Sequence, residues 1–192
     1  MYTVMKQFLI TDQRRKGALR ALYPRKGIVM DFTLLLEKGM SNLSSKGAFL
    51  TVKGGAGVNT MTISWGFVGF MWNKPHFITV VRPQRYTKDV LDSGADCFTI
   101  SIPFDGHLKE ALSVCGTKSG RDIDKSAVVK FSPARTVASP IVEECGLYYE
   151  CKINTAQLLD GKLLMPEIVQ KFYEDDFHYL YFGEIVECYA KG

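Results

Sequence analysis

Residues 58–87 narrow the choice of folds, because small polar and large apolar side chains alternate along their first part. The small polar residues are Asn59, Thr60, Thr62 and Ser64, and the large apolar residues are Met61, Ile63 and Trp65. A period of two is typical of a half-buried β-strand. We therefore expect a strand here that carries a row of small polar groups on one face.

A second apolar run, at residues 75–81, ends beside three residues that suit an anion. These are Arg82, Arg85 and Thr87, and we expect a short helix to begin next to them. The free N–H groups of a helix start, together with guanidinium donors, favour phosphate binding. The alternative is an ordinary pair of exposed surface arginines.

Strand patterns outnumber helix patterns in the rest of the chain. The glycine-rich residues 54–57 separate two alternating segments and suit a hairpin turn, and they match neither a P-loop nor a dinucleotide fingerprint. Further strands are expected at residues 97–103, 148–159 and 179–189, and short helices at 31–39, 86–93, 105–113 and 166–173. This pattern predicts a mainly β fold, an antiparallel barrel with short helical insertions.

The 192 residues suffice for one well-buried domain, but their charge is unevenly distributed. Residues 1–29 hold seven Lys or Arg and one Asp, a charge of +6, which leaves −2 of the net +4 for the remainder. We interpret residues 1–29 as a basic N-terminal extension, either disordered or a start-site artefact, with a targeting arm as the alternative, and residues 30–192 as the domain. The mildly acidic domain does not favour nucleic-acid binding, and no apolar run is long enough to cross a membrane.

The cysteines indicate a reducing compartment. They are odd in number and form no C-x-x-C pair: Cys97, Cys115, Cys145, Cys151 and Cys188. Free thiols in a cytoplasmic protein fit this pattern better than a disulfide framework or a zinc site. No set of histidines and carboxylates has metal-ligand spacing, so we expect no metal.

Four segments resemble a known family. The segments NTMTISWG, VRPQRYT, CGTKSGRDIDK and HYLYFGEI are similar to those of the flavin reductase-like proteins with an FMN-binding split β-barrel, the group that includes flavoredoxin. The resemblance runs from about residue 46 to the C-terminus. It implies an antiparallel split β-barrel with short helical insertions, bound FMN and a homodimer.

The resemblance also implies a set of cofactor-binding residues. Asn59, Thr60, Met61 and Thr62 would run beside the isoalloxazine and ribityl parts of FMN, with Ser64, Trp65 and Tyr86 as further candidates. Arg82, Arg85 and Thr87 would hold the phosphate, and Ser119, Gly120 and Arg121 would approach the flavin from a later loop. We expect the neighbouring Lys118 and Lys125 to be solvated.

His178 is the candidate catalytic residue. In related flavin reductases a histidine in an H-x-x-x-x-G segment lies near the nicotinamide side of the flavin, and HYLYFG matches that segment. The implied role is to position NAD(P)H as the second substrate. An ordinary surface or core histidine is the alternative, and His76 and His107 are given no role.

The implied function is electron transfer from NAD(P)H or a protein donor, through bound FMN, to an acceptor. Two other functions fit the same residues. One is a non-enzymatic electron carrier similar to flavoredoxin, and the other is a split-barrel module for another anionic ligand. The arginine cluster would serve any phosphate or carboxylate, so it does not distinguish between them.

Overall fold

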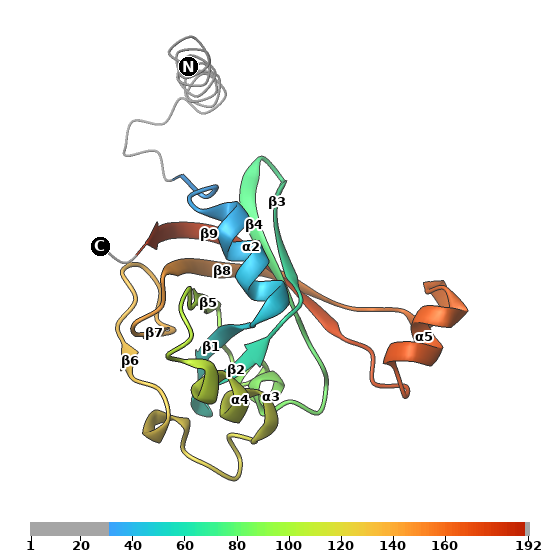
Figure 1. Ribbon diagram of the computed structural model, residues 1–192. Helices are drawn as coiled ribbons and strands as arrows, with labels where there is room; N and C mark the ends of the chain where they lie inside the picture. The colour runs from blue at the N-terminus through green and yellow to red at the C-terminus, as the bar shows by residue number, and fades with distance from the viewer. Residues whose placement is uncertain (1–30, 191–192) are drawn as a thin grey trace, which may run out of the picture. The chain divides into compact units, whose positions relative to one another are not determined.

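The computed structural model describes residues 31–190, and the predicted N-terminal extension at residues 1–29 lies outside them. Seven antiparallel strands form one sheet in the order β2-β1-β5-β8-β9-β4-β3 (Figure 1). Their bounds are β1 (Ala48–Gly54), β2 (Gly57–Ile63), β3 (Gly66–Met71), β4 (Lys74–Val81), β5 (Cys97–Ile102), β8 (Leu147–Leu158) and β9 (Tyr179–Ala190). A two-stranded sheet joins β6 (Phe131–Ser132) to β7 (Ile141–Val142). The prediction of a mainly β, antiparallel fold is confirmed.

Short helices connect the strands. They are α2 (Leu36–Ser45), α3 (Tyr86–Asp92), α4 (Lys109–Thr117) and α5 (Pro166–Phe172), with the 3-10 turns η1 (Lys125–Ala127) and η2 (Gly161–Leu163). Helices α3 and α5 lie where the sequence predicts them. The other two begin later than predicted. Helix α2 begins after Leu35, which has the left-handed conformation, and it continues past the predicted end at residue 39, with Gly39 buried inside it.

Strand β3 has no counterpart among the predicted strands. It pairs with β4 through a tight turn in which Trp72 and Asn73 have φ angles of 52° and 58°. Positive φ at both central residues is the signature of a type I′ hairpin turn. Asn tolerates this conformation, but Trp seldom adopts it, so the sequence carries only half of the usual turn signal.

The inner face of the sheet forms the core. Its fully buried side chains include Phe49, Phe77, Phe98 and Tyr149, and the rings of Phe77 and Tyr149 lie 5.5 Å apart between centroids. Burying each large apolar side chain stabilises the fold by roughly 1.5–3 kcal/mol. All five cysteines are also buried as free thiols.

One buried carboxylate anchors the loop between β6 and β7. Glu150 on β8 accepts hydrogen bonds from the backbone N–H groups of Arg135 and Thr136, both at 2.7 Å. It also accepts from the hydroxyls of Thr136 and Tyr189 at 2.6 and 2.9 Å. Four donors satisfy a charge that would otherwise be costly to bury.

Two parts of the fold position the functional residues. Helices α3 and α4 pack on β1 and β2, at one end of the sheet. Strands β8 and β9 pair along their whole length and carry α5 at their far end (Figure 1). Among the described residues, no helix is both long and apolar enough to span a membrane.

Candidate functional site

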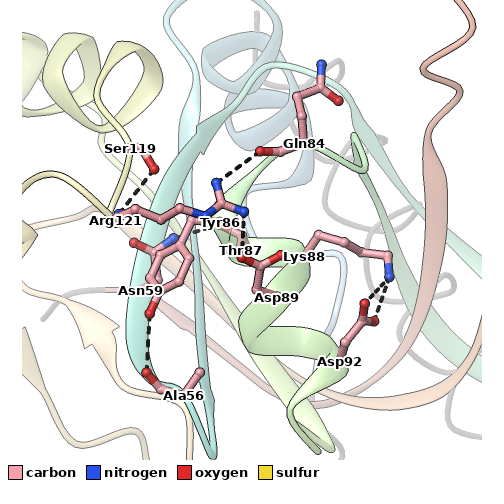
Figure 2. Close-up of polar contacts among 10 residues, drawn as sticks. All are labelled: Ala56, Asn59, Gln84, Tyr86, Thr87, Lys88, Asp89, Asp92, Ser119 and Arg121. Carbon is pink, nitrogen blue, oxygen red and sulfur yellow. Dashed lines mark hydrogen bonds and ion pairs between the residues drawn. The ribbon is translucent and has the colours of Figure 1, made fainter.

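The candidate site is built around Asn59 on β2. The Asn59 side-chain amide donates to the hydroxyl of Thr87 at the start of α3, at 2.8 Å (Figure 2). Gly120, in the loop after α4, packs against the same asparagine: a Cβ there would overlap Asn59 Oδ1 and lie 2.7 Å from Tyr86 Cδ1. Strand β2, the start of α3 and the loop after α4 therefore meet at one point although they are distant in sequence. The loop requires glycine at position 120.

Arg121 continues this contact across the surface. Its guanidinium lies 5.3 Å from the centre of the Tyr86 ring, forms an ion pair with Asp89 and donates to the backbone oxygen of Gln84 at 3.2 Å (Figure 2). The Arg121 backbone N–H donates to Ser119 Oγ at 3.1 Å. These contacts fix the loop after α4 onto the start of α3. A polar pocket of about 340 Å³ lies here, and it is lined by Val58, Asn59, Tyr86 and residues 120–125.

The row of hydroxyls on β2 is not an open lining. Thr60 is fully buried and donates to the backbone oxygen of Leu50 at 3.2 Å, and Thr62 donates to that of Leu112 on α4 at 2.6 Å. Met61 lies on the other face, in the core. Since β2 is an edge strand, its unpaired backbone groups are what it offers to a ligand.

Lys125 was missed by the sequence analysis, which placed it in solvent. Its side chain is buried, with only 6% of the residue exposed, and Nζ donates to the backbone oxygens of Thr60 at 2.7 Å and Cys115 at 3.1 Å. Burial is the main cause that lowers the pKa of Lys125; the nearby Cys115 raises it and Arg85 lowers it further. A buried positive charge thus lies beside β2, on the side where no further strand of the described sheet pairs with it. Asp124, which accepts from the Ser126 N–H at 2.9 Å, caps the short turn that carries Lys125.

The two arginines predicted to hold phosphate have different surroundings. Arg82 forms an ion pair with Asp176 and donates to the backbone oxygen of Phe172 at 2.6 Å. Arg85 is exposed and donates to the backbone oxygen of Gly116 at 3.1 Å. The Arg82 guanidinium is therefore committed to the segment after α5, whereas Arg85 faces the loop that carries Lys125.

His178 lies at the start of β9 and is 7% exposed. The Tyr173 hydroxyl lies 3.0 Å from His178 Nδ1, and the indole of Trp65 lies 5.2 Å from the imidazole between ring centres. Burial lowers the pKa of His178 to about 4, and the positive charges of Arg82 and Arg85 act in the same direction. The imidazole is therefore neutral at physiological pH.

The positive charge of Arg85 lowers the pKa of both Lys125 and His178, in each case as a smaller cause than burial. The structure thus places a polar pocket and a buried ammonium group at β2 and a neutral histidine at the start of β9. The sequence-family model named flavin reductase like domain matches residues 40–192 of this chain. The chain belongs to this family.

Solved structures with the flavin reductase-like fold resemble the chain along most of its length. Flavoredoxin from Methanosarcina acetivorans is 22% identical, with a TM-score of 0.58 over 76% of this chain and 68% of that one. The FMN-binding protein from Thermus thermophilus with bound 1-cyclohex-2-enone is 22% identical, with a TM-score of 0.59 over 75% and 69%. The styrene monooxygenase flavin reductase from Pseudomonas putida S12 is 15% identical, with a TM-score of 0.55 over 76% and 79%. The comparison with curated proteins gives no match.

These similarities confirm the predicted FMN-binding split-barrel fold. Within this flavin reductase-like chain, the structure brings together six of the thirteen predicted cofactor-binding residues, namely Asn59, Tyr86, Thr87, Ser119, Gly120 and Arg121. Trp65 lies apart from them, 45% exposed, beside His178. Ser64 is exposed just after β2. The residues that sequence reasoning missed are Lys125, Tyr173 and Asp176, and only the similarity of the CGTKSGRDIDK segment marked the first of them.

Proposed function

We propose that this protein is an FMN-binding oxidoreductase that transfers electrons from NAD(P)H or a protein donor through bound FMN to an acceptor. The observation that carries the proposal is the position of Lys125, a buried cation held on the open edge of β2. A buried ammonium group is costly unless it has a partner of opposite charge or strong acceptors. Here it has two carbonyl oxygens and can donate one more hydrogen bond.

The chemistry of the donor set fits FMN. FMN has an anionic phosphate and a ring edge that carries carbonyl oxygens and ring nitrogens. Arg85 would bind the phosphate, and Lys125 with the backbone groups of Thr60 and Thr62 would bind the ring edge. Gly116 and Gly120 allow close approach, since a Cβ at Gly116 would lie 3.3 Å from Thr62.

When bound, FMN supplies the electron-transfer chemistry. The protein residues bind it, orient it and stabilise negative charge. Lys125 would supply positive charge at the ring edge, and Arg85 would supply it at the phosphate. Trp65 and the neutral His178 would face the second substrate, which needs alignment more than acid–base catalysis.

The comparisons support this class of function through proteins of the same fold. One is the flavin reductase of a styrene monooxygenase, and another is an FMN-binding protein that binds 1-cyclohex-2-enone. An electron carrier without a nicotinamide site is the second candidate, since a flavoredoxin has the same fold. Steady-state oxidation of NADH and NADPH by the FMN-loaded protein separates the two. Bound FMN without turnover of either nucleotide would exclude the reductase and leave the carrier.

A homodimer is part of the proposal. Several large apolar side chains are exposed on β3 and around α5: Phe67, Phe70, Trp72, Leu163, Met165, Ile168 and Phe172. Exposed apolar groups in such number are typical of an interaction surface. Light scattering coupled to size-exclusion chromatography tests this, and a monomer at micromolar concentration would contradict it.

The primary test is the visible absorption spectrum of the untagged protein as purified, with the released chromophore identified by mass. We expect a yellow protein that releases FMN. A colourless protein that also fails to take up added FMN would overturn the proposal. The barrel would then be a candidate for binding another anion.

A further inference from the structure

His178 belongs to an aromatic cluster that encloses one side of its ring. Trp65, Phe172 and Tyr173 surround it: Trp65 contacts Phe172 edge-on with centroids 5.5 Å apart, and the Tyr173 ring lies edge-on to the imidazole, also at 5.5 Å. The imidazole forms a single hydrogen bond with a described residue, the one between Nδ1 and the Tyr173 hydroxyl. That contact determines which imidazole nitrogen carries the proton.

The chemistry of the two groups sets the direction of this hydrogen bond. A phenol is a stronger acid than an imidazole N–H, and an imidazole nitrogen is a better acceptor than a phenol oxygen. The positive charge of Arg82 beside the Tyr173 ring, 5.3 Å from its centre, favours donation by the hydroxyl. A neutral imidazole that accepts at Nδ1 must carry its proton at Nε2.

The Nε2 atom is available to a ligand. It has no hydrogen-bond partner among the described residues. It is also absent from the fully buried, unpartnered side-chain atoms of those residues, so it is not fully buried. It therefore reaches the surface. Trp65, which is 45% exposed, lies beside the imidazole ring and offers a flat apolar contact.

The segment that carries Tyr173 is fixed by a separate set of contacts. Asp176 pairs with Arg82 and accepts from Gln84 Nε2 at 2.8 Å, and Arg82 also holds the backbone oxygen of Phe172. These contacts tie both ends of the turn to the end of β4. Tyr173 is thus held beside the imidazole by Arg82 and Gln84, neither of which donates a hydrogen bond to the imidazole.

We propose that Tyr173 is a positioning residue that donates to His178 Nδ1, so that His178 presents an Nε2–H donor to the carbonyl-type oxygen of a flat second substrate stacked on Trp65. This inference rests on the proposed function, and it adds the role of Tyr173 and the class of group recognised. The recognised oxygen belongs to a neutral carboxamide or ketone. Nicotinamide and an aromatic ketone are two sources of that chemistry.

The tautomer of His178 is directly measurable in the FMN-loaded full-length protein. Labelling histidine with ¹⁵N gives signals from three residues, and the His178→Gln variant assigns the signal of interest. We expect Nδ1 to have the shift of an accepting nitrogen and Nε2 that of a protonated one. Tyr173→Phe, which keeps the ring and removes the hydroxyl, should convert this to a mixture of both tautomers.

The matched control is Tyr179→Phe, which removes a hydroxyl from the residue next to His178 that has no contact with the imidazole in the described structure. It should leave the tautomer unchanged. The His76 and His107 signals report whether each variant is folded. A protonated Nδ1 in the wild type, or an unchanged tautomer in a folded Tyr173→Phe variant, would overturn the proposal.

Ligand titrations distinguish the two sources of the oxygen. Nicotinamide and acetophenone are added separately, and the shift of the His178 Nε2–H signal is followed. We expect at least one probe to shift it in the wild type, with about tenfold weaker apparent affinity in Tyr173→Phe. No shift with either probe would overturn the proposed recognition. FMN content, measured on the same samples, tests the proposed function separately.

Discussion

Lys125 Nζ lies 2.7 Å from the backbone oxygen of Thr60, so a charged side chain from the loop after α4 reaches the outer edge of β2. The same nitrogen lies 3.1 Å from the backbone oxygen of Cys115 at the end of α4. Lys125 therefore joins the strand, the helix and the loop that form the proposed flavin site. Its charge and its position have separate consequences.

Lys125→Met should weaken FMN retention about tenfold or more, because a charge-assisted hydrogen bond contributes about 1.5–3 kcal/mol. The substitution keeps most of the buried aliphatic chain. Equilibrium dialysis of FMN measures the change. Lys118→Met is the control, since Lys118 is exposed in the same loop. Equal retention in both variants would show that Lys125 serves folding alone.

Arg85→Ala should weaken FMN retention, whereas Arg82→Ala should leave it nearly unchanged. Arg85 is exposed beside Gly116, while Arg82 is committed to Asp176 and Phe172. Loss of Arg82 should instead loosen the segment after α5 and increase its cleavage by protease. FMN titration and limited proteolysis of both variants give the two readouts. Loss of FMN in the Arg82→Ala variant would instead support Arg82 as a ligand of the phosphate.

Gly120→Ala should displace Asn59 and Tyr86 and reduce FMN retention, because the new Cβ has no room between them. Thermal unfolding should show a loss of about 1–3 kcal/mol, the usual cost of overpacking. Gly106→Ala is the matched control, as a Cβ there meets no atom within 4 Å. If both variants behave alike, the close contact at Gly120 has no role in the site.

The stability of the protein should fall as the pH drops from 6.5 towards 4, through His178. Its pKa is lowered to about 4 in the folded protein, so in this window the unfolded chain takes up a proton that the folded chain does not. Arg82, Arg85 and Tyr173 face the imidazole. The two positive guanidinium groups disfavour its protonation, and the Tyr173 hydroxyl does not offset the positive charge that protonation would create.

The charge of Asp176 opposes this effect on His178. The pKa of Asp176 is itself lowered, chiefly by the Gln84 hydrogen bond, so it stays ionised throughout this window. Urea unfolding at about pH 7 and about pH 5 measures the effect. The His178→Gln variant should lose less stability than the wild type between these conditions, and parallel losses would contradict the assignment.

The sequence predicted most strands, and six of the thirteen residues that it proposed for the cofactor lie together in the structure. Strands with regular alternation and clear turn residues, such as those flanking residues 54–57, lie where local pattern places them. β3 was missed because Trp72 occupies a turn position with positive φ, where glycine or asparagine is the usual signal. Local pattern therefore succeeds where the turn has its usual residues.

The burial of Lys125 and the pairing of Arg82 with Asp176 could not be predicted from local pattern. Both depend on residues far apart in the chain: Thr60 lies 65 positions from Lys125, and Asp176 lies 94 positions from Arg82. A lysine in a polar loop is normally solvated, and an arginine before a helix is normally free. Only the tertiary structure gives these side chains their partners.

The position of β9 has a consequence for synthesis on the ribosome. β9 lies between β8 and β4, so its hydrogen bonds join the β3–β4 hairpin to the other described strands of the main sheet. Residues 66–81 leave the exit tunnel about a hundred residues before their partner strand does. During that interval the β4 edge of the hairpin is unpaired in addition to the β3 edge, which stays unpaired in the described sheet, and several aromatic rings are exposed. This is the period in which the nascent chain is most exposed to aggregation and chaperone binding.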